Sequence, residues 1–267
     1  MTPGQRAEAQ IAELGIRDPK DLDVEAIAFD AGARVEYTSL VGCEATLVGL
    51  ESKAIITIKP SPVRGRERFS IGHELGHWDL HRGKSFRCRV DEPSQNLESD
   101  VPLERQADEY ASHLLMPSTL FNPAVKSFRW PDFSKIQELA NLFQTSQMAT
   151  CIRIAKVDTL PVIVACYSAQ RLLWHVFAPH VPRRWFLKGT LDPDSFAYDL
   201  LVSGIECSTV RKQSADVWFE NNDAGEFEIL EQSLSAAPGK VLVMLYLSDS
   251  EMFDRGYDPD VRWQKRI

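Results

Sequence analysis

The chain has 267 residues, of which 44% are hydrophobic and 25% charged, and its formal net charge is −8. These values are typical of a globular protein long enough for two or three domains, and the negative charge argues against a general nucleic-acid binder. No apolar run approaches the roughly 18 residues of a membrane span, and the N-terminus lacks the apolar core of a signal peptide. We therefore expect a cytoplasmic protein without a membrane partner. Its five cysteines form no C-x-x-C pair, which predicts reduced thiols.

The first part of the chain predicts a small α+β layer. Helices are expected over residues 4–14 and 23–32, with Asp23 as the N-cap of the second. Three strands are predicted next, over residues 34–37, 45–50 and 54–58. An edge of such a sheet can hold an extended peptide by strand addition, although the sequence does not indicate which strand forms that edge.

The motif H-E-x-x-H at residues 73–77 is the strongest functional signal in the chain. On a helix, His73 and His77 are four residues apart, so they share one face and can both reach a single cation. Glu74 lies between them and is expected to be the catalytic base that takes a proton from water, without being a ligand itself. The alternative is a buried helix that carries two histidines by chance.

The helix that carries this motif has its own start and stop signals. Ser61 followed by Pro62 is typical of an N-cap and a first helical residue, and Gly83 is typical of a helix end. Between them, the apolar residues leave little polar surface except the face with the two histidines. Because unpartnered polar groups are costly in a protein interior, a bound metal ion explains this pattern better than chance.

A tetrahedral zinc site needs a third protein ligand. On a continuous helix His81 would lie about 12 Å from His73 along the axis, too far to share one ion. Glu104, near the start of a helix predicted over residues 102–116, is the better candidate. Asp108 follows one turn later and could hydrogen-bond the outer nitrogen of a ligating histidine. The alternative for Glu104 is an exposed acid that the helix dipole favours in a first turn.

Two further segments have alternative interpretations. Residues 84–101 show no periodicity and predict a loop, which is either a lid over the site or a solvated connector. Residues 133–157 predict two short helices with a tight turn, a candidate helix-turn-helix. The second helix offers only Arg153 and Lys156 as cations, so we favour a helical hairpin that packs on the preceding domain over one that reads DNA.

From about residue 159 the composition changes, and a separate α/β domain with a mostly antiparallel sheet is predicted. Its helix is expected over residues 194–202. Its strands are expected over residues 161–167, 172–178, 215–220, 226–231 and 240–247.

Three motifs together resemble the ImmA/IrrE family of metallo-endopeptidases, over roughly residues 20–157. They are R-F-S-I-G-H-E-L-G-H at 68–77, E-x-x-A-D-x-Y-A at 104–111 and L-L-M-P at 114–117. The resemblance implies a small thermolysin-like, gluzincin-type core in which His73, His77 and Glu104 bind Zn²⁺, with Mn²⁺ as the alternative ion. The length and the C-terminal extension resemble the IrrE radiation-response branch, whose longer members carry a GAF-like sensor domain.

Together these signals predict a metallopeptidase domain (1–125), a helix-turn-helix-like segment (126–158) and a C-terminal α/β, GAF-like regulatory domain (159–267). The family resemblance implies that the substrate is a helix-turn-helix repressor of the XRE type, whose cleavage releases stress or DNA-damage genes. We do not expect specific DNA binding by the chain itself. The alternative is a DNA-binding or ligand-sensing transcription regulator with a vestigial peptidase site.

Overall fold

The computed structural model describes residues 1–82, 86–88, 101–204 and 209–254. By contact density the chain divides into two compact units, and neither is continuous in sequence. The first consists of Met1–Ser127 and Gln137–Thr150, and the second of Phe128–Ile136 and Cys151–Ile267. The predicted three-part division at residues 125 and 158 stays a prediction. Of the helices in the described ranges, none has the length and apolar character needed to cross a membrane.

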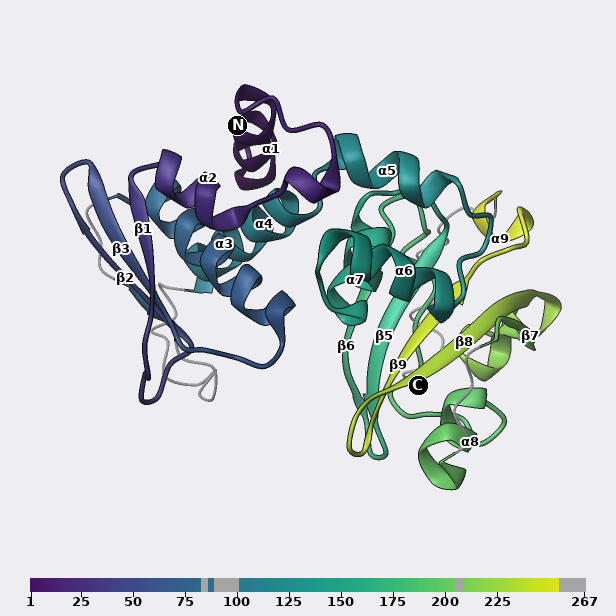
Figure 1. Cartoon of the computed structure of the whole chain (residues 1–267). Helices are drawn as coiled ribbons and strands as arrows, with labels where there is room; N and C mark the ends of the chain where they lie inside the picture. Colours follow the sequence, from purple (N-terminus) through teal and green to yellow (C-terminus); the bar gives the residue numbers. More distant parts are fainter. Residues whose placement is uncertain (83–85, 89–100, 205–208, 255–267) are drawn as a thin grey trace. The chain divides into compact units, whose positions relative to one another are not determined.

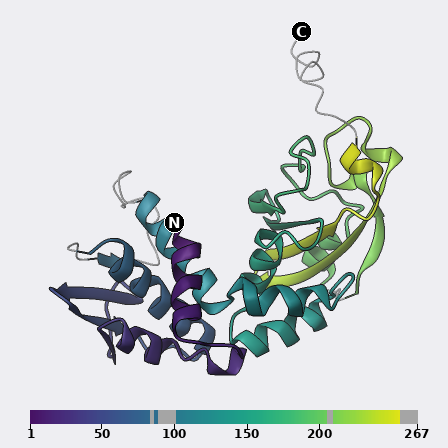
Figure 2. The same cartoon turned by 90° about the horizontal axis from the view of Figure 1, so that it is seen from above.

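The first unit is a mixed α+β layer, as predicted (Figure 1). Its sheet has the strand order β1-β3-β2-β4, with β1 parallel to β3 and the other pairs antiparallel. Helix α3 packs on this sheet, α4 packs on α3, and α1 packs on α4 (Figures 1 and 2). The elements are α1 (Pro3–Glu13), the 3-10 turn η1 (Pro19–Asp21), α2 (Val24–Asp30), β1 (Ala33–Tyr37), β2 (Ala45–Leu50), β3 (Lys53–Ile58), α3 (Arg64–Leu80), β4 (Phe86–Cys88), α4 (Val101–Leu115) and α5 (Ser118–Lys126).

Alternation along β3 explains which face of the sheet receives α3. Ala54, Ile56 and Ile58 are buried, whereas Ile55 between them is 44% exposed. Because successive side chains of a strand point to opposite faces, the buried set forms one apolar face for α3 to cover.

The bounds of α3 differ from the predicted ones. The helix begins at Arg64 with Val63 as its N-cap, not after Ser61. The reason is local: the Ser61 hydroxyl accepts a hydrogen bond from the Val63 amide (3.1 Å), so it stabilises a turn before the helix. At the other end α3 stops at Leu80, and the predicted stop signal Gly83 lies outside the described residues.

Most of the predicted loop at 84–101 also lies outside the described residues, but part of it forms a strand. Phe86–Cys88 are β4, which pairs antiparallel with the first half of β2. Two of the predicted strands, β2 and β3, form an antiparallel hairpin, and β4 extends it on the β2 side.

Small residues allow α3 and α4 to approach closely. A Cβ atom added to Gly76 would lie 3.1 Å from both the Ala107 Cα and the Tyr110 Cβ, and one added to Gly72 would lie 3.4 Å from Ala111. The pairs Gly72 with Ala111 and Gly76 with Ala107 show that the helices run antiparallel along this contact. Their side chains on the flanking positions, including His73 and His77, are therefore brought against α4.

The predicted helix pair is present as α6 (Phe133–Phe143) and α7 (Gln147–Lys156). The division between the two units passes through both helices. On α7, Thr150 and Arg153 are 0% and 1% exposed, which keeps two of the side chains that a DNA-reading helix would present away from solvent. Specific DNA binding was not expected, and this burial agrees with that expectation without testing it.

The second unit contains a fully antiparallel sheet of strand order β6-β5-β9-β8-β7. Its start, Phe128–Ile136, is fixed to the sheet by hydrogen bonds: Gln232 donates to the Pro131 carbonyl (2.7 Å) and accepts from the Phe133 amide (2.9 Å). The elements are β5 (Val162–Ser168), β6 (Leu172–Phe177), α8 (Phe196–Ser203), β7 (Arg211–Ser214), the 3-10 turns η2 (Ala215–Val217) and η3 (Ala224–Glu226), β8 (Glu228–Ala237), β9 (Lys240–Tyr246) and α9 (Glu251–Asp254).

The prediction of a strand at residues 215–220 was wrong. This segment starts with the 3-10 turn η2, and Val217, Trp218 and Phe219 are buried at consecutive positions, which a half-buried strand does not allow. The strand lies just before it, as β7, whose four residues Arg-Lys-Gln-Ser carry no apolar alternation and so gave no strand signal.

A buried carboxyl group links α8 to the sheet of this unit. Glu231 on β8 is 0% exposed and accepts hydrogen bonds from the Ala197 amide (2.9 Å) and the Trp218 indole (2.8 Å). Burial raises its pKa to about 7, because these donors and the charge of Arg211 offset only part of the desolvation.

Since the folded-state pKa of Glu231 lies above the ordinary value of 4.5, folding favours the protonated form. Its contribution to stability is therefore fully present below about pH 4.5 and is lost as pH rises through about 7. We expect the unfolding free energy of the wild type, relative to Glu231→Gln, to fall by up to about 3 kcal/mol between pH 5 and 8. Denaturant titrations of both proteins at the two pH values measure this difference, and a pH-independent difference would contradict the buried titration.

Gly72 and Gly76 of α3 give a matched test of the helix contact. Gly76→Ala places a methyl group against the backbone of α4, so we expect a destabilisation of about 1–2 kcal/mol despite the better helix propensity of alanine. Gly72→Ala makes an ordinary contact and should be neutral or slightly stabilising. Denaturation midpoints of the two variants measure the difference. Equal midpoints would show that α4 can move to accept the methyl group without a loss of stability.

Candidate functional site

The structure brings His73, His77 and Glu104 together although 27 residues separate His77 from Glu104 in sequence. The Nε2 atoms of the two histidines are 3.1 Å apart. The Glu104 Oε2 lies 3.1 Å from the Nε2 of His73, and the Glu104 Oε1 lies 3.4 Å from the Nε2 of His77. Each residue thus directs one ligand atom to a common point between α3 and α4.

These distances suit a tetrahedral metal ion. With metal–ligand bonds of about 2.0–2.1 Å, the ligand atoms of a tetrahedral zinc site lie about 3.3 Å from one another. The side chains of His77, His73 and Glu104 are 0%, 10% and 27% exposed, so His77 forms the buried end of the cluster and Glu104 the end nearest to solvent. The cluster is therefore least buried on the Glu104 side.

The charge states also suit metal binding. Burial of Glu104 would raise its pKa, but hydrogen bonds with His73 and His77 outweigh burial and lower the pKa to about 2. Burial lowers the pKa of His77, so its imidazole is neutral at pH 7. An ionised carboxylate and a neutral imidazole are the forms that bind a cation.

Asp108 lies where the sequence predicted it, on the outer side of a histidine. Its carboxylate is 2.9 Å from the Nδ1 of His73. Its side chain is 55% exposed, so its charge remains in contact with water. An acceptor at Nδ1 keeps the proton of a neutral imidazole on that atom and leaves Nε2 free to bind an ion.

From the sequence, His81 was considered only as a metal ligand. This interpretation missed that His81 lies next to the outer nitrogen of His77, as Asp108 lies next to that of His73. The Nδ1 atoms of His77 and His81 are 3.1 Å apart, and the Nε2 of His81 is 2.8 Å from the Gln106 Oε1. His81 is the C-cap residue of α3 and is 9% exposed. Its spacing of four residues from His77 was the available signal, since such residues are neighbours on a helix.

Glu74, the predicted base, is 0% exposed and lies on α3 between the two histidines. Its position beside His73 in the motif agrees with the predicted role, which stays a prediction. Tyr110 of α4, by contrast, is fully buried and donates its hydroxyl to the Gln10 side chain of α1, so it serves packing.

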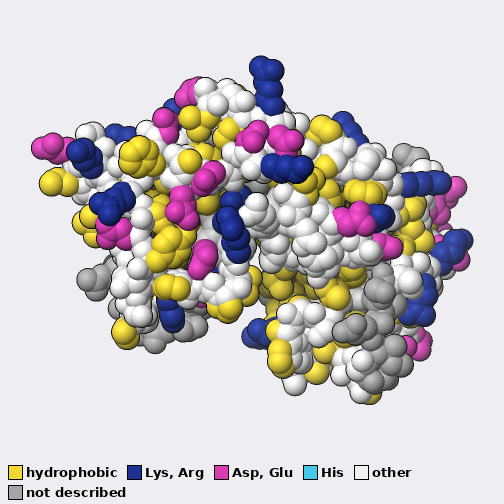
Figure 3. Space-filling view, viewed as in Figure 1, with side chains coloured by type: hydrophobic (Ala, Val, Ile, Leu, Met, Phe, Trp, Pro, Cys, Tyr) yellow, Lys and Arg dark blue, Asp and Glu magenta, His cyan; other side chains and the backbone are white. Residues whose placement is uncertain are grey.

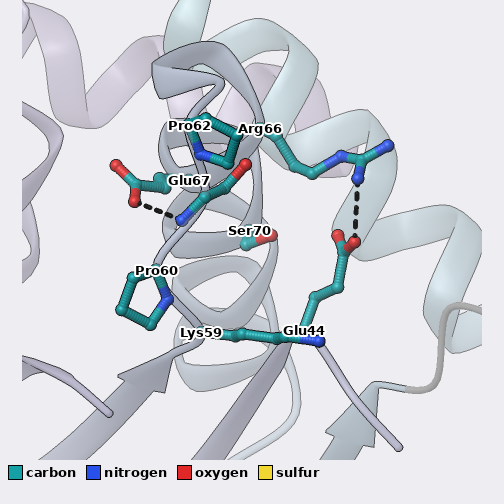
Figure 4. A pocket seen from close by; sticks show the side chains of 8 residues that line it. Glu44, Lys59, Pro60, Pro62, Arg66, Glu67 and Ser70 are labelled. Atoms are coloured by element: carbon teal, nitrogen blue, oxygen red, sulfur yellow. Dashed lines mark hydrogen bonds and ion pairs between the residues drawn. The ribbon is translucent and has the colours of Figure 1, made fainter. Parts of the chain in front are cut away.

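A polar pocket of about 170 Å³ lies at the start of α3 (Figure 4). Arg66 pairs there with Glu44 (3.2 Å), and Glu67 accepts a hydrogen bond from the Ser61 amide (2.8 Å). Arg66 and Ser70 are seven and three residues before His73, so they share its face of α3. The lining residues are Glu44, Lys59, Pro60, Ser61, Pro62, Arg66, Glu67 and Ser70.

Comparison with known proteins places this site in a family. Residues 28–155 match the family model of the IrrE N-terminal-like domain, a peptidase family. No curated protein sequence matches the chain. Among solved structures, the chain is similar to one described as a Mycobacterium tuberculosis transcriptional regulator, with a TM-score of 0.61 and 15% identity over 91% of this chain and 74% of that one. At this identity the likeness concerns the fold alone. Residues 28–155, which carry His73, His77 and Glu104, match the IrrE N-terminal-like peptidase domain, and this match supports membership of the ImmA/IrrE family.

Proposed function

We propose that the chain is a zinc-dependent endopeptidase of the H-E-x-x-H type, with Mn²⁺ as the alternative ion, that cleaves a helix-turn-helix repressor of the XRE type. The observation that carries the proposal is the convergence of the Nε2 atoms of His73 and His77 with the Glu104 carboxylate, whose two oxygens lie 3.1 Å from the first and 3.4 Å from the second. If Asp108 and His81 hold the Nδ1 protons of the two histidines, three electron-rich atoms face one another. Such atoms repel unless a cation lies between them.

We assign a separate role in hydrolysis to each residue around this cluster. A bound zinc ion would supply Lewis acidity, which lowers the pKa of water and polarises a carbonyl group. Glu74 would take a proton from the attacking water and deliver it to the leaving amine. Asp108 orients His73.

The substrate would bind as an extended segment. In the described part of the first sheet β1 and β4 are the terminal strands. Of these two, β4 follows α3 in sequence, so it is our candidate for strand addition. Two residues that line the pocket of Figure 4, Arg66 and Ser70, share the His73 face of α3, so the pocket is our candidate subsite for a polar side chain. A peptide that binds in this way must leave its own fold, so we place the cut in a loop or linker.

The identity of the substrate rests on the family. Its members resemble one another in cleaving helix-turn-helix repressors, and a cut in the dimerisation part of such a repressor would weaken operator binding, because each half-site alone binds weakly. We also propose a thermolysin-like, gluzincin-type core for the first unit and a GAF-like sensor for the second. The antiparallel sheet and the flanking helix α8 support the sensor. The response would concern stress or DNA damage in the cytoplasm.

A second candidate is a DNA-binding or ligand-sensing transcription regulator with a vestigial peptidase site. The name of the similar solved structure favours it. Against it stand the burial of Thr150 and Arg153 on α7 and the distribution of charge. On the face seen in Figure 3, Lys and Arg side chains are interspersed with Asp and Glu and form no continuous basic surface. A sequence-specific, salt-resistant footprint on duplex DNA by the chain alone would favour this second candidate.

The roles of Glu74 and His73 can be separated by substitution. Glu74→Gln should retain zinc and lose cleavage by a factor of at least about 100, because it removes the base and leaves the ligands. His73→Ala should lose both zinc and cleavage. Metal content by mass spectrometry and cleavage rates measure the two effects. A Glu74→Gln protein that cleaves at the wild-type rate would exclude the mechanism.

The substrate proposal predicts a single dominant cut. Incubation of the zinc-loaded chain with candidate repressors encoded near its gene should give two fragments, with the cut in a loop or linker of the dimerisation part and apolar residues on both sides. Casein should be cleaved slowly or not at all, because part of the recognition would come from surfaces outside the metal site. Mass spectrometry of the fragments locates the cut. Scattered cuts, or equal activity on casein, would point to a general peptidase instead.

A further inference from the structure

We propose that His81 and Gln106 are positioning residues, which hold His77 in the one tautomer that can bind a cation through Nε2. The inference rests on the metal site proposed above and adds two residues to it. They form an uninterrupted path: His77 Nδ1 to His81 Nδ1 at 3.1 Å, and His81 Nε2 to Gln106 Oε1 at 2.8 Å.

Counting protons fixes the direction of this path. A neutral imidazole carries one proton, so a His77 that binds through Nε2 has its proton on Nδ1. That proton is donated to His81 Nδ1, which must then be an acceptor. His81 therefore carries its own proton on Nε2 and donates it to the Gln106 carbonyl oxygen. Each N–H group has an acceptor, and the path ends on an atom that cannot donate.

The opposite direction would block the site. If the Gln106 amide nitrogen donated to His81 Nε2, the His81 proton would lie on Nδ1 and be donated to His77. The proton of His77 would then occupy Nε2, the atom that faces His73 and Glu104. With the Gln106 Oε1 toward His81, only the tautomer that leaves the ligand atom free gives both N–H groups an acceptor.

Burial explains why the outer partners of the two histidines differ. His73 is partly exposed and uses the Asp108 carboxylate, whose side chain is 55% exposed and keeps its charge hydrated. The Nδ1 of His77 faces His81, which is 9% exposed, and a carboxylate in the place of His81 would lose its hydration at a large cost in free energy. A neutral imidazole followed by a neutral amide gives His77 an acceptor without a buried charge.

The fold provides this arrangement at the end of α3. The helix stops at Leu80, and His81, as its C-cap, donates its amide to the His77 carbonyl (2.9 Å). This bond holds His81 one turn after His77. Gln106 lies on α4 between Glu104 and Asp108. This short stretch of α4 therefore supplies the ligand Glu104 and two acceptors, Asp108 for His73 and Gln106 for His81.

The first test compares variants by their affinity for zinc alone, in competition with a chromophoric chelator. His81→Leu removes the acceptor, and we expect zinc affinity to fall about 10- to 100-fold. His81→Asn restores a side-chain oxygen near Nδ1 and should recover part of the loss. Gln106→Leu, on an exposed position, should weaken binding less than His81→Leu but more than His113→Leu, a control on the same helix with its partner on α1. Unfolding midpoints of the metal-free proteins confirm that the variants fold.

The second test reads the tautomers directly in the full chain. Two-bond ¹H–¹⁵N correlation spectra of the histidine-labelled, zinc-loaded protein should show His81 protonated on Nε2 and His77 on Nδ1. A His81 protonated on Nδ1, or zinc affinity in His81→Leu and Gln106→Leu equal to the wild type, would overturn the inference and leave the proposed function intact. A chain that binds zinc with this tautomer pattern and cleaves no repressor would overturn the function and leave the inference standing.

Discussion

The close contact between α3 and α4 is the constraint on which the rest of the site depends. Gly72 and Gly76 on one helix face Ala111 and Ala107 on the other, and larger residues at these positions would separate the two backbones. The glycines alternate with the histidines, so the surface that allows the approach also carries the ligands into it. A ligand distance of about 3 Å leaves little tolerance, and a shift of one ångström between the helices would break the cluster.

Electrostatics and burial then assign different tasks to similar side chains. Three histidines follow one another at four-residue spacing, two on α3 and the third at its C-cap, yet only two direct a nitrogen toward Glu104. The third lies behind the second and acts through it. Likewise, Glu104 and Asp108 are one turn apart on α4, and one faces the ligand cluster while the other faces the outer nitrogen of His73. Position along the helix axis, rather than residue type, therefore decides which side chain is a ligand and which one contacts the outer nitrogen of a ligand.

Local patterns predicted much of this structure. The spacing of His73 and His77, the helix of Glu104 and the alternation in β2 and β3 are short-range signals, and the elements they predict are present. What could not be predicted depends on other parts of the chain. β7 has no apolar alternation because it lies at the end of its sheet, and Ser61 bonds to a turn rather than to the helix. His81 was excluded as a ligand by its distance, but its role behind His77 required Gln106 of α4, 25 residues away.

The division of the chain through α6 and α7 has a consequence for how the protein can be shortened. Phe143 packs against Phe121 in the first unit (5.2 Å between ring centroids), whereas Pro131, earlier on the chain, is hydrogen-bonded to Tyr246 in the second. A chain cut after α5 loses part of the packing of the first unit, and one cut after α7 keeps Phe128–Ile136 without the sheet that binds it. No single truncation separates the two units cleanly, so neither is available as an independent module for exchange between proteins.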